Sequence, residues 1–146
     1  MSGEITPIES VVEWSTDAGA TWTEMPNITT VTPDGGDRDV GETFVHDQDT
    51  PLLGVGKRKA VTLTIKGVYN AVSEAPYDKF EDFKRYRTPV RFRWTLTTDT
   101  TGNEQFTSAD GYVMSVLPPE ADAAASEIAL FEAKVKVPDY TRAIIA

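Results

Sequence analysis

The feature that most constrains the fold is a strict alternation of apolar and polar side chains in three stretches of the chain. Residues 61–69 read VTLTIKGVY, residues 90–97 read VRFRWTLT, and residues 131–137 read FEAKVKV. Successive side chains of a β-strand point to opposite faces, so this period is typical of strands with one face on a core and the other in water or against a partner. We therefore predict that Phe92 and Trp94 are buried.

Six further segments are expected to be short strands separated by turns that contain glycine and aspartate. They are Val11–Thr16, Thr21–Met25, Ile28–Thr32, Thr43–Asp47, Gln105–Ser108 and Tyr112–Leu117. Many short strands with such turns are typical of sandwiches and barrels. The strand and turn pattern therefore predicts an all-β fold, either a sandwich or a barrel.

One segment departs from the strand pattern and predicts a helix near Pro76–Arg87. Aromatic side chains recur there at three- to four-residue spacing, which places them on one helical face. Ser73 is positioned to cap the helix, and Pro76 is tolerated in the first turn because the N–H groups there lack partners. The helix is expected to end before Pro89, since a residue before proline avoids the α region. The aromatic residues are Tyr77, Phe80, Phe83 and Tyr86.

Length and spacing indicate a single domain over residues 1–146, with no internal repeat and no linker. The stretch 33–59 is unusual because it is rich in glycine and acidic, and only Thr43–Asp47 within it resembles a strand. A connection of this length in a compact domain is usually functional or mobile. We expect a long loop that is poorly ordered in a free monomer and becomes ordered in an assembly.

Composition excludes several functions. The net charge of −9 argues against general affinity for nucleic acid or an anionic membrane. No cysteine is present, so thiolate metal sites and cysteine nucleophiles are excluded, and the single histidine, His46, makes a histidine-based triad improbable. The first residues show no secretory signal, and no apolar run reaches the ~20 residues needed to span a bilayer. We expect no enzymatic activity, no cofactor and no metal.

Residues 15–22, STDAGATW, match the pattern S-x-D-x-G-x-T-W, which looks like the Asp-box of sialidases and related propellers. Asp17 can accept hydrogen bonds from backbone donors in the turn, Gly19 can adopt a positive φ, and Trp22 can pack under the hairpin. The motif occurs once, whereas a propeller needs many blades. A structural β-hairpin therefore accounts for it.

Other local patterns are weaker candidates for a site. His46, Asp47 and Asp49 offer metal ligands, but a magnesium or calcium site needs more carboxylates, so a solvated loop is favoured. Residues 54–57, GVGK, lack the remaining positions of a phosphate-binding loop. The arginines near Phe92 and Trp94 could indicate single-strand binding, but the aromatic residues are expected to face the core.

Charge is distributed unevenly along the chain. Residues 1–50 contain eleven acidic residues and one basic residue, whereas residues 51–100 contain ten basic and five acidic residues. Two solvated surfaces would explain this, and so would complementary patches that meet between copies of the same protein. Under the second interpretation, the acidic region 34–49 of one copy meets basic groups of another in a head-to-tail contact.

The order of these features resembles the major tail tube proteins of long-tailed, siphovirus-type bacteriophages. The resemblance is carried by an early Trp-containing hairpin, an acidic loop ending in TPLLGVGKRK, the strand AVTLTIKGVYNA, a helix, VRFRWTLTTDTTGNEQFTSADGYV, LPPEADAAA and the final strand EIALFEAKVKVPDY. It spans nearly the whole chain and is weakest over the first ten residues.

The resemblance implies an all-β fold with one flanking α-helix, a β-sandwich closing towards a barrel. It also implies a structural subunit of a virion tail, made in the host cytoplasm, that forms stacked rings of six copies. Tape measure protein and then DNA would pass through the tube, without specific binding of DNA, and tail terminator and tip proteins would be further partners. The long loop would reach into a neighbouring subunit or ring. The residues assigned to self-assembly are Asp47, Asp49, Leu52, Leu53, Lys57, Arg58, Lys59, Arg85 and Arg87.

Two rival functions stay open on the sequence. The Asp-box-like turn and the three tryptophans would suit a carbohydrate- or ligand-binding β-sandwich. A sialidase-class enzyme is the second rival, although no arginine triad can be placed from the sequence. A binding module should remain small in solution, whereas a tube subunit should form rings or filaments.

Overall fold

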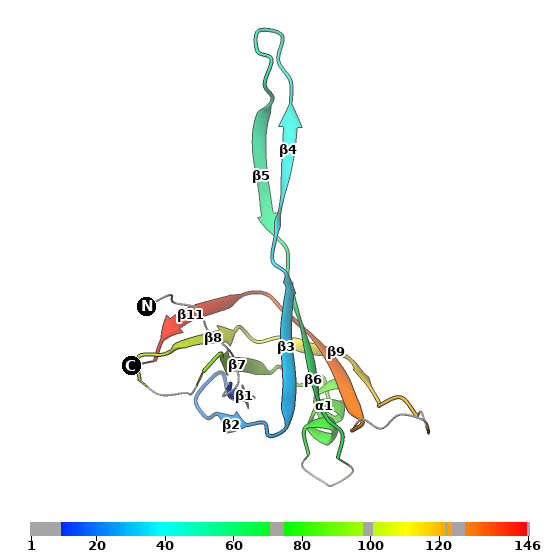
Figure 1. Cartoon of the computed structure of the whole chain (residues 1–146). Helices are drawn as coiled ribbons and strands as arrows, with labels where there is room; N and C mark the ends of the chain where they lie inside the picture. Colours follow the sequence, from blue (N-terminus) through cyan, green and yellow to red (C-terminus); the bar gives the residue numbers. More distant parts are fainter. Residues whose placement is uncertain (1–9, 71–74, 98–100, 122, 124–127, 146) are drawn as a thin grey trace.

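The computed structural model describes residues 10–70, 75–97, 101–121, 123 and 128–145 (Figure 1). Within these residues the chain forms strands arranged in three sheets and one α-helix. The strands in chain order are β1 (Val12–Ser15), β2 (Thr23–Glu24), β3 (Ile28–Gly35), β4 (Arg38–Thr43), β5 (Leu52–Arg58), β6 (Val61–Val68), β7 (Arg91–Thr95), β8 (Glu104–Ser108), β9 (Tyr112–Leu117), β10 (Leu130–Val137) and β11 (Tyr140–Ile144).

Two of the sheets form the body of the molecule. The five-stranded sheet has the order β11-β8-β7-β1-β2, and the four-stranded sheet has the order β3-β6-β10-β9. All pairings in them are antiparallel. The layered all-β architecture is therefore confirmed. Neither sheet closes into a barrel over the described residues, because each ends in two strands without a further partner.

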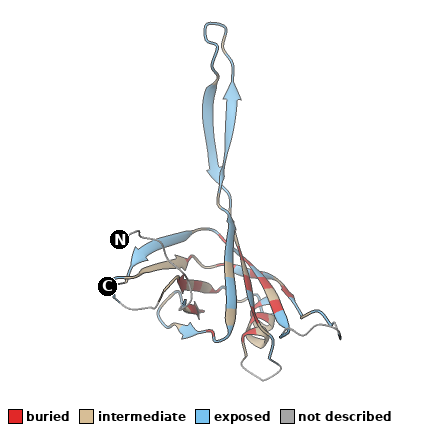
Figure 2. Ribbon diagram, viewed as in Figure 1, coloured by how far each residue is buried: buried red, intermediate tan, exposed pale blue. Residues whose placement is uncertain are grey.

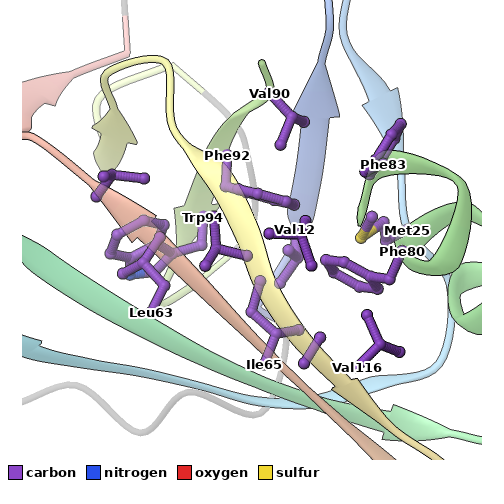
Figure 3. Close-up of a cluster of buried hydrophobic side chains, with 14 of the residues drawn as sticks. Val12, Met25, Leu63, Ile65, Phe80, Phe83, Val90, Phe92, Trp94 and Val116 are labelled. Carbon is purple, nitrogen blue, oxygen red and sulfur yellow. The ribbon is translucent and has the colours of Figure 1, made fainter. Parts of the chain in front are cut away.

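The hydrophobic core lies between these two sheets (Figures 2 and 3). The predicted alternation holds, since Phe92 is 0% and Trp94 6% exposed. On the other sheet, Leu63 and Ile65 are fully buried while Thr64 between them is only partly buried. Apolar side chains that leave water on one face of each sheet supply the main favourable free energy for bringing the sheets together.

The helix α1 (Pro76–Arg85) covers one end of the core. Phe80 is fully buried and stacks on Phe92 with ring centroids 5.7 Å apart, and Phe83 meets Trp14 edge to face at 5.1 Å. Tyr86, expected on the same face, is instead 69% exposed because the helix has ended one residue before it.

The helix termini differ from the expectation at one end. The N-cap position is occupied by Ala75 without a side-chain hydrogen bond, and Ser73, the expected cap, lies outside the described residues. At the C-terminus the N–H of Thr88 donates to the carbonyl of Phe83 at 3.1 Å, while Arg87 adopts φ = 54°. This is the six-to-one hydrogen bond of a Schellman motif, in which glycine is the usual residue at the left-handed position.

The stretch 33–59 is an extended β-hairpin, so the prediction of a long loop was wrong for most of it. β4 and β5 pair with each other as a separate two-stranded sheet that projects from the body (Figure 1). The expected strand Thr43–Asp47 is absent, since β4 ends at Thr43 and a turn follows. Every residue of β4 and β5 is exposed, and a ribbon exposed on both faces needs no alternation of apolar and polar residues.

Candidate self-assembly surface

The hairpin carries apolar side chains with no core to bury them. Its cross-strand pairs place Val40 opposite Val55 and Glu42 opposite Leu53 on one face. Val40 is 57%, Leu53 64% and Val55 67% exposed. Isolated apolar residues on a surface are ordinary, whereas a row of exposed apolar residues is typical of surfaces at which proteins bind one another.

The opposite face of the hairpin has a different character. Gly41 pairs with Gly54, and Thr43 pairs with Leu52, which is 51% exposed. A Cβ atom added at either glycine would meet nothing within 4 Å. Paired glycines in a strand weaken it but leave bare backbone that another chain can approach closely. The hairpin therefore offers an apolar face and a flat face to a partner.

The tip of the hairpin holds the acidic residues assigned to self-assembly. Asp47 lies in the turn between the strands, Asp49 follows it, and both are exposed. Leu52 and Leu53 begin β5 immediately afterwards. The structure thus brings four of the nine predicted residues together at the end of the hairpin farthest from the body (Figure 1).

The basic residues Lys57, Arg58 and Lys59 lie at the opposite end of the hairpin, where it joins the body. The guanidinium of Arg58 donates two hydrogen bonds to the carboxylate of Asp139, at 2.9 and 2.5 Å. The ammonium of Lys59 lies 3.1 Å from Asp39. Two of these three cations are therefore already paired within their own chain, whereas Lys57 forms no ion pair with another described residue.

Arg85 and Arg87 lie far from the hairpin. They flank the C-terminus of α1, which sits towards the end of the body remote from the hairpin (Figure 1). Both are exposed, and neither forms an ion pair with another described residue. Basic residues at this position also interact favourably with the helix dipole. The nine predicted residues therefore fall into three groups: the hairpin tip, the hairpin root, and the C-terminal end of α1 at the opposite end of the molecule from the tip.

The Asp-box-like segment forms the predicted turn of the β1–β2 hairpin. Asp17 Oδ1 accepts hydrogen bonds from the Ser15 hydroxyl at 2.6 Å and from the Thr21 N–H at 2.9 Å, and Gly19 has φ = 89°. The hydrogen bond from Ser15 and those from Thr21 lower the pKa of Asp17 to about 2, because they stabilise the carboxylate.

The tryptophans do not form a platform for sugar stacking. The Arg93 guanidinium lies over the Trp22 ring at 4.3 Å, and Arg93 also donates to both carboxylate oxygens of Glu13 at 3.0 Å. Trp14 packs on Phe83, while Trp94 is buried. Cation–π and aromatic contacts within the chain thus engage each tryptophan, which removes the main support for a carbohydrate-binding module.

Metal-binding clusters and membrane-spanning helices are both absent from the described part of the chain. Among those residues no group of three or more histidine, cysteine, aspartate or glutamate side chains could hold a metal ion. No helix in the same part of the chain is both long and apolar enough to cross a membrane.

Sequence reasoning missed several residues of the surface. Val40, Val55 and Phe44 are exposed on or next to the hairpin, and only a strand assignment for β4 and β5 would have placed them there. Asp139, the partner of Arg58, is 81 residues away in the chain, so no local signal could have identified it.

The fold resembles solved structures of phage tails and related injection systems. The anti-feeding prophage (AFP) baseplate, 6-fold symmetrised, has a chain with TM-score 0.76 and 10% identity, covering 99% of each chain. The PVC sheath-tube complex of an extracellular contractile injection system, in its extended state, gives 0.71 and 15%, covering 99% of this chain and 95% of that one. The SPP1 tail tube gives 0.69 and 14%, covering 97% and 80%.

Comparison by sequence gives no match to a protein-family model and none to a curated protein. The structural likeness therefore identifies the fold, a tail-tube-like fold that occurs in phage and contractile injection assemblies. The similar structures are components of tail tubes and injection-system assemblies.

Proposed function

We propose that this chain is the structural subunit of a phage tail tube and assembles with copies of itself into stacked hexameric rings. The observation that carries the proposal is the exposed hairpin β4–β5, attached to a tail-tube-like body and lined with apolar residues that no part of the described body covers. We keep the siphovirus-type tail expected from the sequence as part of the proposal, and the structural similarity to the SPP1 tail tube supports it.

Ring closure is expected to use the four-stranded sheet. Its edge strands β3 and β9 are eight and six residues long, whereas one edge of the five-stranded sheet, β2, has only two residues. An edge strand presents unpaired N–H and C=O groups, so β9 of one copy can pair with β3 of the next.

Stacking is expected to use the two remote surfaces. The acidic tip with Asp47 and Asp49, together with Leu52 and Leu53, would contact a copy in the next ring, and Arg85 and Arg87 are the cations available there. Because different patches meet on each side, the contact is heterologous and repeats along a filament. Each exposed ion pair contributes only about 0.2–1 kcal/mol, so the leucines carry most of the stacking energy.

The outward face of the four-stranded sheet would line the conduit, because the five-stranded sheet and α1 need the larger outer circumference. This face carries three lysines, Lys66, Lys134 and Lys136, against Glu132 and Asp34, with threonines on β3 and β6 and exposed apolar residues on β9 and β10. The charges on this wall would nearly balance. Phosphate groups of DNA would meet about as many anions as cations there, so DNA would pass without specific binding.

Electron microscopy of the concentrated protein, with size exclusion at increasing concentration, tests the proposal. We expect rings or tubes with sixfold symmetry. Tail terminator, tip and tape measure proteins would be its further partners, in the tail of a virion made in the host cytoplasm. A chain that remains a monomer at high concentration and binds an oligosaccharide would favour the carbohydrate-binding alternative.

A further inference from the structure

The direction of the hairpin is determined where it leaves the body. The β3–β6 ribbon continues across this root through hydrogen bonds from Gly36 N to Ala60 O at 3.3 Å and from Lys59 N to Asp37 O at 2.9 Å. Beyond the root, no third strand of the described chain pairs with β4 or β5. Two-stranded ribbons twist and bend more easily than larger sheets, so the hairpin needs a further contact to hold one direction.

The ion pair between Arg58 and Asp139 supplies such a contact. Its two parallel hydrogen bonds, at 2.9 and 2.5 Å, join the last residue of β5 to the turn between β10 and β11. The body holds Asp139 in place, because its Oδ1 accepts from the Tyr140 N–H at 2.7 Å and its carbonyl accepts from the Ala109 N–H at 2.9 Å. A bidentate pair of this kind restrains orientation as well as distance.

The other polar contacts near the root do not reach the body. Lys59 pairs with Asp39, and Arg38 donates to the carbonyl of Gly56 at 3.1 Å. All four residues belong to the hairpin or its root, so these contacts stiffen the ribbon without fixing its angle to the sheets.

We propose that the Arg58–Asp139 pair is a latch that holds the β4–β5 hairpin at a fixed angle to the body before assembly. Arg58 is then a positioning residue within its own chain and does not contact a second copy. The inference rests on the proposed function, in which the hairpin docks on another subunit. A hairpin already held in its docking direction loses less conformational freedom on binding, so assembly starts at a lower protein concentration.

The experiment measures hairpin direction and assembly separately. The chain has no cysteine, so Glu24→Cys and Gln48→Cys place two spin labels, one on the exposed β2 and one at the hairpin tip. Pulsed electron paramagnetic resonance on dilute monomer gives the distance distribution between them. Sedimentation of unlabelled protein gives the critical concentration for assembly.

With Arg58→Gln or Asp139→Asn we expect a broader distance distribution and a critical concentration raised about fivefold, the effect of losing one exposed ion pair. The charge swap Arg58→Asp with Asp139→Arg should restore both quantities in part, because it forms the ion pair again but not the hydrogen bond from the Tyr140 N–H to the side chain of residue 139. Arg142→Gln is the matched control and makes the same change in charge. Arg142 lies on β11, away from the hairpin, and is 4.0 Å from Glu104 on β8. Thermal unfolding checks that every variant is folded.

Two outcomes would overturn the latch. One is a distance distribution that Arg58→Gln leaves unchanged. The other is loss of assembly that the swap fails to repair, which would place Arg58 in contact with a second copy. If the wild type never assembles while its distribution is narrow and Arg58→Gln broadens it, the proposed function fails and the latch stands.

Discussion

The two halves of one β-ribbon behave in opposite ways in this molecule. In the body, β3 and β6 pair over a core, and Val61, Leu63 and Ile65 of β6 are at most 1% exposed. In the projecting half, β4 and β5 continue the same two segments of chain, and Val55 on β5 is 67% exposed (Figure 2). The same backbone architecture therefore supports the fold in one half and presents a surface in the other.

Because of this difference, the stability of the monomer and its assembly with other copies depend on different residues. Burying a large apolar side chain contributes about 1.5–3 kcal/mol, which the residues of β6 gain on folding and the residues of β5 do not. The hairpin can gain a similar amount only when another molecule covers it. Substitutions in the two halves should therefore separate the folding of the monomer from its polymerisation.

The largest expected effect is on the core. Phe80→Ala removes a fully buried ring that stacks on Phe92, so the free energy of unfolding should fall by about 3–5 kcal/mol in urea denaturation. Val55→Ala on the hairpin should change it by less than about 0.5 kcal/mol. If the free energy of unfolding fell equally in the two variants, the hairpin would be buried in the monomer, and the contrast between the two halves of the ribbon would be wrong.

The leucines at the start of β5 should show the reverse behaviour. Leu52→Ser with Leu53→Ser should leave unfolding of the monomer nearly unchanged, since the two side chains are 51% and 64% exposed. The critical concentration for assembly should rise about tenfold or more, because each leucine loses burial against the next copy. Sedimentation measures this, and normal polymerisation of the double variant would favour an electrostatic stacking contact instead.

Arg87 provides a finer test at the opposite end of the chain. Its φ of 54° lies in the left-handed region, so Arg87→Gly should leave the monomer as stable or more stable by up to about 1 kcal/mol. If Arg87 meets the acidic hairpin tip, the same variant should raise the critical concentration several-fold, and more at low salt than at high salt. If the critical concentration were unchanged at both salt concentrations, Arg87 would not contribute to the interface.

The smallest effect concerns acid pH and the β1–β2 turn. Folding lowers the pKa of Asp17 from 3.8 to about 2, so its carboxylate contributes stability that is complete above pH 4 and is lost as the pH falls towards 2. Thermal melts should show the difference between wild type and Asp17→Asn shrinking across this range. Ser15→Ala should flatten the same dependence, because the Ser15 hydroxyl is the main cause of the lowered pKa. A difference that does not vary with pH would contradict this role.

Much of the body could be predicted from local pattern. Alternation identified β6, β7 and β10, and the bounds Tyr112–Leu117 of β9 were confirmed without change. A strand with one buried face needs an apolar residue at every second position, and this alternation can be recognised in the sequence. β11 (Tyr140–Ile144) was missed because all its residues are exposed and no such period is required.

The sequence by itself determined the all-β class, the buried face of the body and the Asp17 turn, because each depends on residues close together in the chain. Only the tertiary structure decided that residues 38–58 form a projecting ribbon, that Arg58 is paired with Asp139, and that Arg85 and Arg87 lie at the far end from the acidic tip. A pair of residues 81 positions apart produces no local sequence pattern, because it depends on how distant segments meet. A ribbon exposed on both faces likewise needs no alternation of apolar and polar residues.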